Sequence, residues 1–158
     1  MPRSRPEAEA FAECERRAVA LLARREHSRR ELERKLAVRG FAPPVVAETL
    51  DRLEQNGLLS SLRFVSGFIA ARAERGTGPA KIRAELVQRG IPPAEAEAAV
   101  RESDEDWAAL ARRVRSKRFG AAPPRDYAER ARQARFLHGR GFEPEHIDAA
   151  LEVGADSD

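Results

Sequence analysis

The chain has 158 residues and a formal net charge of only +3, yet 35% of its residues are charged, against about 25% in an average domain. Its apolar content of 42% is too high for a disordered chain, and the scarcity of aromatic residues argues against a broad β-sandwich core. The sequence contains no apolar run long enough to span a membrane and no secretory signal, so we expect a soluble, cytoplasmic protein without a membrane contact. Cys14 is the only cysteine, which excludes an internal disulfide and a thiolate zinc cluster.

A short motif, Arg-Gly followed by an apolar residue, occurs three times, at 39–41, 89–91 and 140–142, with spacings of 50 and 51 residues. Each copy continues in register. A leucine precedes the arginine by three positions, a proline follows the apolar residue by two, and apolar residues follow it by five and nine. Agreement at so many positions predicts three structural repeats.

The first repeat is predicted to form three helices. The apolar side of its first helix consists of Phe11, Cys14, Ala18, Leu21 and Leu22. Ser28 and Glu31 have the spacing of a capping box and begin the second helix, on which Leu32 and Leu36 share a face. Gly40 supplies the left-handed residue that ends this helix. Pro43-Pro44 opens the third helix, because proline at the first position loses no hydrogen bond.

The second repeat follows the same plan. The apolar side of its first helix consists of Leu62, Val65, Phe68 and Ile69. Residues 76–79, Gly-Thr-Gly-Pro, are interpreted as a helix stop and restart, not as a phosphate loop. Ile82 and Leu86 lie on the next helix, and Pro92-Pro93 opens the third.

The third repeat is predicted to begin at Ser103, three residues before Asp106, which is a further capping signal. The apolar positions of its helices are Trp107, Leu110 or Ala111, Val114, Tyr127, Ala131, Ala134, Leu137, Phe142, Ile147 and Leu151. Arg132-Gln133 stands where the other repeats have Leu32 or Ile82. We therefore expect this repeat to pack less tightly.

Together these patterns predict an all-α fold, an elongated and curved array of three tandem three-helix repeats with about nine helices. The repeats are expected at 8–59, 60–102 and 103–153, with flexible tails at 1–7 and 154–158. A three-helix unit with few apolar side chains is marginal alone, and stacking of successive units supplies the missing burial.

Charge follows the same period as the repeats. Basic residues gather in the first and second helices, whereas the third helices, within 94–106 and 143–158, are acidic. Stacking would align the basic helices into a positive stripe that neutralises phosphates. The alternative is a set of solvated faces with local ion pairs, but the threefold segregation favours a function. The candidate contacts with nucleic acid or a partner are Arg24, Arg25, Arg29, Arg72, Arg75, Lys81, Arg83, Arg112, Arg113, Arg115 and Lys117.

The sequence carries almost no signal of an enzyme. His27, His138 and His146 are the only histidines, and neither metal-ligand spacings nor nucleotide-binding motifs are present. His27, one residue before a capping serine, is interpreted as a histidine in a surface loop. We therefore predict no catalytic residue, no metal and no cofactor. Asn and Gln, the natural readers of adenine, are scarce, so we expect no sequence-specific reading of DNA.

Four segments, 21–41, 50–59, 68–91 and 136–151, together resemble the RecX family of bacterial recombinase regulators. The resemblance rests on His-Ser-x-x-Glu-Leu-x-x-Lys-Leu from His27, Gly-x-Gly-Pro-x-x-Ile-x-x-Glu-Leu from Gly76, and Phe-Leu-x-x-Arg-Gly-Phe from Phe136. It covers about residues 15–152. The family often carries acidic residues where this chain has Ser60-Ser61, so any contact made by those acids would be lost here.

The resemblance implies tandem three-helix repeats and a negative regulator of RecA. Family members bind RecA and its filament on single-stranded DNA, in the helical groove. They block filament growth and lower ATP hydrolysis, strand exchange and RecA-assisted cleavage of the SOS repressor. We expect this chain to do the same as a monomer, and to bind single- and double-stranded DNA without sequence specificity.

The alternatives belong to other classes. They are a helical protein that binds DNA phosphates without RecA, a sequence-specific helix-turn-helix binder, a scaffold that contacts only proteins, and a small enzyme. Three similar basic repeats argue against one privileged recognition helix. No residues indicate a catalytic pocket.

Overall fold

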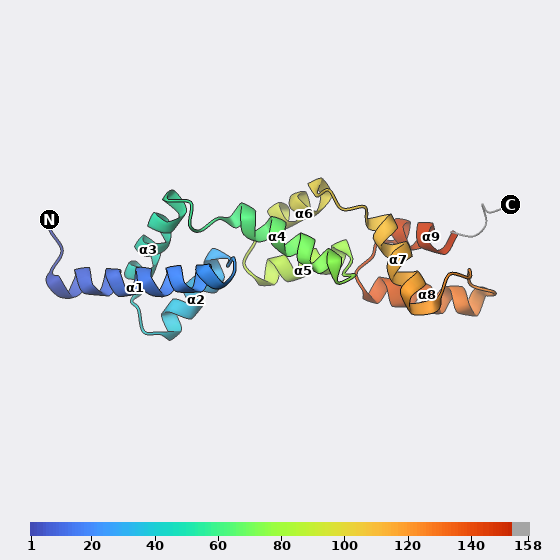
Figure 1. Ribbon diagram of the computed structural model, residues 1–158, viewed down its shortest axis with the longest axis horizontal. Helices are drawn as coiled ribbons and strands as arrows, with labels where there is room; N and C mark the ends of the chain where they lie inside the picture. The colour runs from blue at the N-terminus through green and yellow to red at the C-terminus, as the bar shows by residue number, and fades with distance from the viewer. Residues whose placement is uncertain (153–158) are drawn as a thin grey trace. The chain divides into compact units, whose positions relative to one another are not determined.

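A computed structural model describes residues 1–152, and every regular element in this range is an α-helix (Figure 1). The helices are α1 (Arg5–Arg24), α2 (Arg29–Val38), α3 (Pro43–Gln55), α4 (Ser61–Glu74), α5 (Pro79–Gln88), α6 (Pro93–Glu102), α7 (Trp107–Phe119), α8 (Tyr127–Gly139) and α9 (Pro144–Glu152). The predicted all-α fold of three three-helix repeats is confirmed. The expected tail at 154–158 lies outside the described residues. No described helix has both the length and the apolar character that a membrane span needs.

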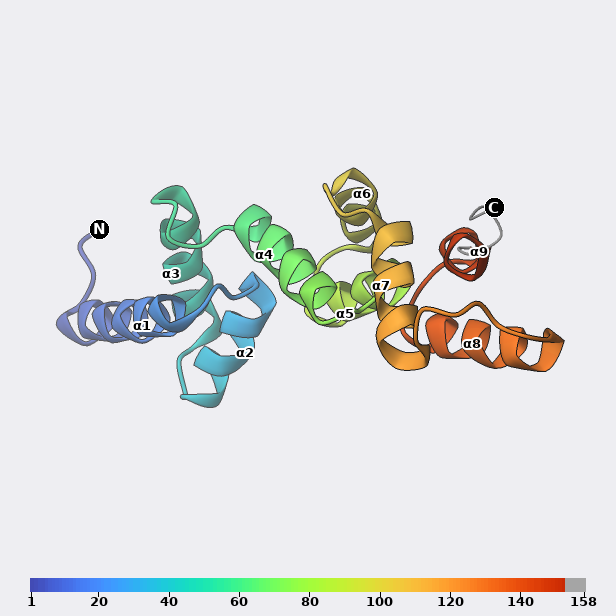
Figure 2. The same ribbon diagram turned by 45° about the vertical axis from the view of Figure 1, so that its right-hand side comes forward.

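The chain divides into two compact units. Unit 1 contains residues 1–67 and 89–91, and unit 2 contains residues 68–88 and the described chain from 92 onward. The boundary falls inside α4, so the middle repeat contributes to both units. In unit 1, α1, α2 and α3 contact one another, as Figure 2 shows. Their buried core consists of Cys14, Ala18, Leu32, Leu36, Val46, Leu50, Leu53 and Leu59.

Unit 2 contains two groups of contacting helices. Helix α5 contacts α6, while α7, α8 and α9 contact one another. The core around the last three helices consists of Ala73, Leu110, Ala111, Leu137, Phe142, Ile147, Ala150 and Leu151. The leucine that precedes each Arg-Gly motif by three positions, Leu36, Leu86 or Leu137, is fully buried. The prediction of a core leucine at this position is therefore confirmed in all three repeats.

Local signals set most helix starts. The Ser28 hydroxyl accepts a hydrogen bond from the Glu31 N–H at 3.1 Å, and the Glu31 carboxylate accepts one from the Ser28 N–H, which confirms the predicted capping box. A second capping box, Ser4 with Glu7, begins α1 at Arg5, inside the segment 1–7 that we expected to be a tail. Ser103 does not cap a helix start. Its hydroxyl donates to the Val100 carbonyl at the end of α6.

The predicted apolar sides of α4 and α8 are wrong at one position each. Leu62 is 77% exposed and Tyr127 is 86% exposed. Both lie in the first turn of their helices, before the residues that reach the core. In α4 the buried residues are Phe64, Val65, Ile69 and Ala73, so the apolar stripe begins two residues later than its periodicity indicates.

The three Arg-Gly motifs end α2, α5 and α8 with a glycine in the left-handed region. Their φ angles are +90°, +97° and +97° at Gly40, Gly90 and Gly141, as predicted for a helix-ending glycine. A Cβ atom at Gly40 would meet nothing within 4 Å, whereas one at Gly90 would lie 2.5 Å from Cδ of Arg30. Two features therefore favour glycine at position 90, namely the positive φ angle and the close side chain of Arg30.

In unit 2 the last Arg-Gly motif meets the start of α5 backbone to backbone. The Gly78 N–H donates to the Arg140 carbonyl at 2.7 Å, and the Ala80 N–H donates to the Gly141 carbonyl at 2.9 Å. A Cβ atom at Gly78 would lie 2.3 Å from the Gly141 carbonyl carbon. In unit 1 the corresponding donor is a side chain, since the Ser28 hydroxyl donates to the Arg89 carbonyl at 2.7 Å. In each unit, the start of the second helix of one repeat therefore donates hydrogen bonds to the Arg-Gly turn of the following repeat.

The close approach at Gly78 predicts a selective loss of stability. We expect Gly78→Ala to lower the free energy of unfolding by about 1–3 kcal/mol, because the added methyl group overlaps the backbone of Gly141. Gly139→Ala is the matched control in unit 2. It lies in a helix with open space around it, and alanine there is expected to be neutral or stabilising. Urea unfolding measures both, and equal stability of the two variants would contradict the packing described.

Candidate functional site

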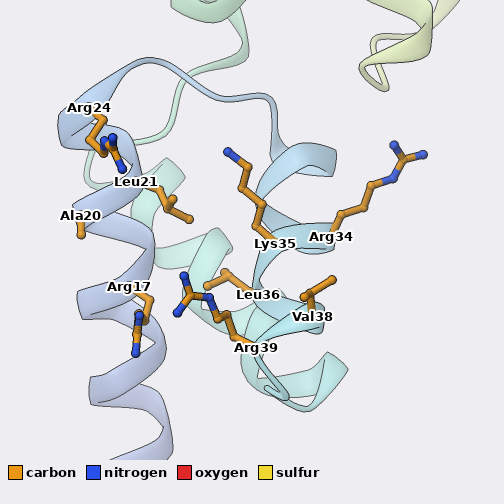
Figure 3. Close-up of a pocket in the computed structure, with 9 residues that line it drawn as sticks. All are labelled: Arg17, Ala20, Leu21, Arg24, Arg34, Lys35, Leu36, Val38 and Arg39. Atoms are coloured by element: carbon orange, nitrogen blue, oxygen red, sulfur yellow. The ribbon is translucent and has the colours of Figure 1, made fainter.

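The first candidate site is a groove of 570 Å³ between α1 and α2 in unit 1, shown in Figure 3. We call it the α1/α2 groove, and its lining residues are Arg17, Ala20, Leu21, Arg24, Arg34, Lys35, Leu36, Val38 and Arg39. Leu21 and Leu36 point toward each other from the two helices, and the Arg39 side chain reaches toward α1. The lining contains five cations and no carboxylate, so the groove is suited to an anionic ligand with some apolar surface.

Three of the five cations in the α1/α2 groove are arginines without a carboxylate partner in the described chain, whereas Arg17 pairs with Glu13 at 3.3 Å. Among the residues that the structure describes, no carboxylate forms an ion pair with Arg24, Arg34 or Arg39. Arg29 is the contrast. Its guanidinium lies 2.8 Å from an Asp51 carboxylate oxygen and also pairs with Glu33 and Glu54. An anion that enters the groove therefore displaces no internal partner of those three arginines.

His27 lies behind the lining of this groove and contacts Lys35, one of the lining residues. It is 1% exposed, so our interpretation of a surface-loop histidine is wrong. Its Nε2 lies 2.9 Å from Lys35 Nζ and its Nδ1 lies 3.0 Å from the Arg25 carbonyl oxygen. The lysine can only donate, so Nε2 accepts and Nδ1–H donates to the carbonyl. Burial lowers the pKa of His27, which keeps the ring neutral and able to accept from Lys35.

The second candidate site is a groove of 370 Å³ in unit 2, bounded by α7, α8 and the end of α4. We call it the α7/α8 groove, and its lining residues are Glu74, Arg75, Gly76, Arg113, Val114, Lys117, Arg118, Phe136 and Arg140. Five cations face a single carboxylate, that of Glu74. Phe136 packs against the core of unit 2 and also reaches the groove. The site thus combines positive charge with an aromatic ring.

The grooves account for four of the predicted contact residues. Arg24 lines the α1/α2 groove, and Arg75, Arg113 and Lys117 line the α7/α8 groove. Arg112 and Lys81 are exposed but line neither groove, and Lys81 packs its Cβ beside Gly141.

Four other predicted contact residues are neutralised within the fold. Arg25 pairs with Glu31 at 2.8 Å, Arg72 pairs with Glu85 at 2.8 Å, and Arg83 pairs with Glu143. Arg29 has the three carboxylate partners described above. Their charges were visible in the sequence, but the carboxylates that face them come from other turns or other helices.

Arg115 is not a surface contact. It is 2% exposed, its Nε donates to Gln133 Oε1 at 2.9 Å, and its Nη2 donates to the Ala122 carbonyl. The basic cluster at 112–118 covers nearly two turns of α7, so one member must face the core. Gln133, which we expected to loosen the third repeat, is buried and forms a polar pair with Arg115 in the place of an apolar contact.

Six groove cations were not among the predicted contact residues: Arg17, Arg34, Lys35, Arg39, Arg118 and Arg140. The signal that could have found them is helical spacing. Arg17, Leu21 and Arg24 recur at intervals of four and three, which places them on one face. The number of charges in a segment does not show on which face of a helix each charge lies. Within residues 1–152, no group of three His, Cys, Asp or Glu side chains is arranged to hold a metal ion.

Comparison with known proteins matches the whole repeat region. Family models described as the first, second and third three-helix domains of RecX match residues 14–53, 62–100 and 104–151. A "Regulatory protein RecX" from Halorhodospira halophila is 45% identical over 141 residues, which are 89% of this chain and 88% of the relative. Another, from Pseudomonas entomophila, is 46% identical over 136 residues, 86% of this chain and 88% of the relative.

Solved structures share the fold. The crystal structure of RecX from Lactobacillus salivarius superposes with a TM-score of 0.79 at 18% identity and covers 92% of this chain and 96% of that one. A crystal structure described as regulatory protein RecX gives a TM-score of 0.77 at 19% identity, with 92% of this chain and 73% of that one covered. At these identities the likeness concerns the fold alone.

Burial of His27 predicts that acid destabilises the protein. The folded chain binds a proton at His27 less readily than the unfolded chain, so stability is full above the ordinary histidine pKa of about 6.5 and falls as pH drops below it. Urea unfolding between about pH 7.5 and about pH 5.5 measures the slope. His27→Gln should flatten it whatever its own stability, and the exposed His138→Gln should not. An unchanged slope in His27→Gln would refute the assignment.

The buried pair of Arg115 and Gln133 predicts non-additive mutations. Gln133→Leu leaves the buried guanidinium without one acceptor and should cost about 1–3 kcal/mol of unfolding free energy. Adding Arg115→Leu removes the unpaired group, so the double variant should be more stable than the sum of the single effects. Thermal or urea unfolding of the four proteins checks this cycle. Strict additivity would show that the two side chains do not interact.

Proposed function

Because the chain belongs to the RecX family of regulatory proteins, which are not enzymes, we propose that it is a negative regulator of RecA. It binds RecA and the RecA filament on single-stranded DNA in the helical groove, as a monomer, and stops filament growth. ATP hydrolysis, strand exchange and cleavage of the SOS repressor decline as a consequence. Because RecA acts on chromosomal DNA, the proposed action takes place in the cytoplasm.

The α1/α2 groove is the observation that supports a binding role most directly. Arg24, Arg34 and Arg39 hold positive charge without a carboxylate partner in the described chain, and Leu21 and the exposed Val38 supply apolar surface. Regulation of this kind needs no chemical step. A ligand that binds one state of a filament more tightly than another shifts the filament toward that state.

A second candidate function is DNA binding without RecA. The α7/α8 groove favours it, because its cations and aromatic ring suit a nucleic acid. Neither groove is lined by Asn or Gln, the side chains that pair with adenine. This composition supports contacts to the backbone of DNA in place of a reading of its sequence.

The test is ATP hydrolysis by RecA on single-stranded DNA, titrated with this protein. We expect inhibition at stoichiometric or lower ratios. The triple variant Arg24→Ala, Arg34→Ala, Arg39→Ala should need several times more protein for the same inhibition. A control triple variant, Arg5→Ala, Arg16→Ala, Arg52→Ala, removes the same charge from unit 1 at exposed, ion-paired positions and should act like the unaltered protein.

Two outcomes would contradict the proposal at different levels. No inhibition by the unaltered protein would overturn the function itself. Equal losses in the groove triple variant and the control triple variant would show that net charge matters and the groove does not. Circular dichroism of each variant confirms that its helix content is retained.

A further inference from the structure

The two grooves occupy equivalent places in the repeat. Arg39 and Arg140 are the arginines of the first and third Arg-Gly motifs, and each lines its groove. Four residues earlier the first repeat has Lys35 and the third has Phe136, and these also line the two grooves. The same helical face therefore carries a cation in one repeat and an aromatic ring in the other.

The middle repeat has lost this site. Its residue four positions before the motif arginine is Glu85, whose carboxylate pairs with Arg72 at 2.8 Å in unit 2. The motif arginine itself, Arg89, lies 3.5 Å from the Glu31 carboxylate in unit 1. An acid in the equivalent column thus neutralises a nearby cation, whereas the first and third repeats place no acid there.

Phe136 holds two arginines of the α7/α8 groove. The guanidinium carbons of Arg118 and Arg140 lie 5.7 and 5.5 Å from the ring centroid, within the range of cation–π attraction. Phe119 meets the same ring edge to face, with centroids 5.3 Å apart. A guanidinium held against an aromatic ring keeps its N–H donors available at its edge. The two arginines are therefore positioned without any carboxylate partner in residues 1–152.

We propose that the α7/α8 groove binds single-stranded nucleic acid, with Phe136 as the residue that positions Arg118 and Arg140 against successive phosphates. Arg75, Arg113 and Lys117 extend the positive lining, and the planes of the held guanidinium groups offer stacking surfaces for unpaired bases. The α1/α2 groove has no aromatic ring and does not share this role. The inference rests on the proposed DNA binding and assigns it to one repeat.

Single-stranded nucleic acid fits this groove better than a duplex does. The volume of 370 Å³ is that of a small-ligand site of about 300–1,000 Å³, into which a flexible strand can place a nucleotide. Bases in a duplex are stacked on one another and cannot also stack on protein groups. A duplex is therefore limited to contacts through its phosphates.

The experiment is fluorescence anisotropy of a fluorescein-labelled oligothymidine with the full-length protein, in the absence of RecA. Phe136→Leu keeps an apolar side chain but removes the ring, and it should weaken binding about 3- to 10-fold. Phe136→Tyr restores the ring and should restore affinity. If Phe136 served only to fill space, leucine would bind as well as phenylalanine, and that result would overturn the positioning role.

A charge series tests the phosphate contacts. The double variant Arg118→Ala, Arg140→Ala should lower the slope of log affinity against log salt by about 1 for each arginine. The control double variant Arg125→Ala, Arg132→Ala removes the same charge from exposed positions outside the groove and should leave the slope near that of the unaltered protein. Equal slopes for the two double variants would overturn the assignment of the site.

Competition separates the possible sources of phosphate. Unlabelled oligothymidine should displace the probe at a lower concentration of phosphate groups than duplex DNA or sodium polyphosphate does, because only the single strand adds base stacking. Equal competition by polyphosphate would show a general anion site and overturn the inference. Failure of the unaltered protein to bind oligothymidine would also overturn it, and would leave inhibition of RecA as a separate question for the hydrolysis assay.

Discussion

Two backbone hydrogen bonds between the start of α5 and the Arg-Gly turn after α8 join the second and third repeats within unit 2. They bring Gly78 and Gly141 so close that neither position has room for a Cβ atom. The same turn holds the backbone of Arg140, whose side chain lines the α7/α8 groove. The constraint that packs the repeat thus also fixes one wall of the candidate site, so a motif that looks purely structural in the sequence also serves the site.

Most of the fold could be predicted because its signals are local. The capping box at Ser28, the left-handed glycines and the proline at the start of each third helix depend on neighbouring residues alone. The errors have a different origin. Leu62 and Tyr127 fit the apolar period but lie in the first turn of their helices, before the first buried residue. Burial depends on what another helix presents, and a period within one helix does not contain that information.

The candidate site could be predicted only in part for the same reason. Charge counting along the chain found Arg24 and Lys117 but also Arg29, whose three carboxylate partners come partly from α3. It also included Arg115, which pairs with Gln133 in the interior. An arginine is available to a ligand only where the fold brings no acid to it, and this is a property of three-dimensional neighbours. The proposed RecA partner came from family resemblance, because the residues alone indicate an anion-binding helical protein.

Hydrogen exchange of this protein, alone and with RecA filaments on single-stranded DNA, tests the central claim most directly. The claim is that unpaired cations in the two grooves make the contacts. Amides in 17–24 and 34–39, and those in 113–118 and 136–140, should exchange more slowly in the presence of filaments. Helix α3, whose residues line neither groove, should exchange as it does without filaments. If the amides of neither groove were protected from exchange, or if protection were confined to the acidic helices α6 and α9, the account would be contradicted.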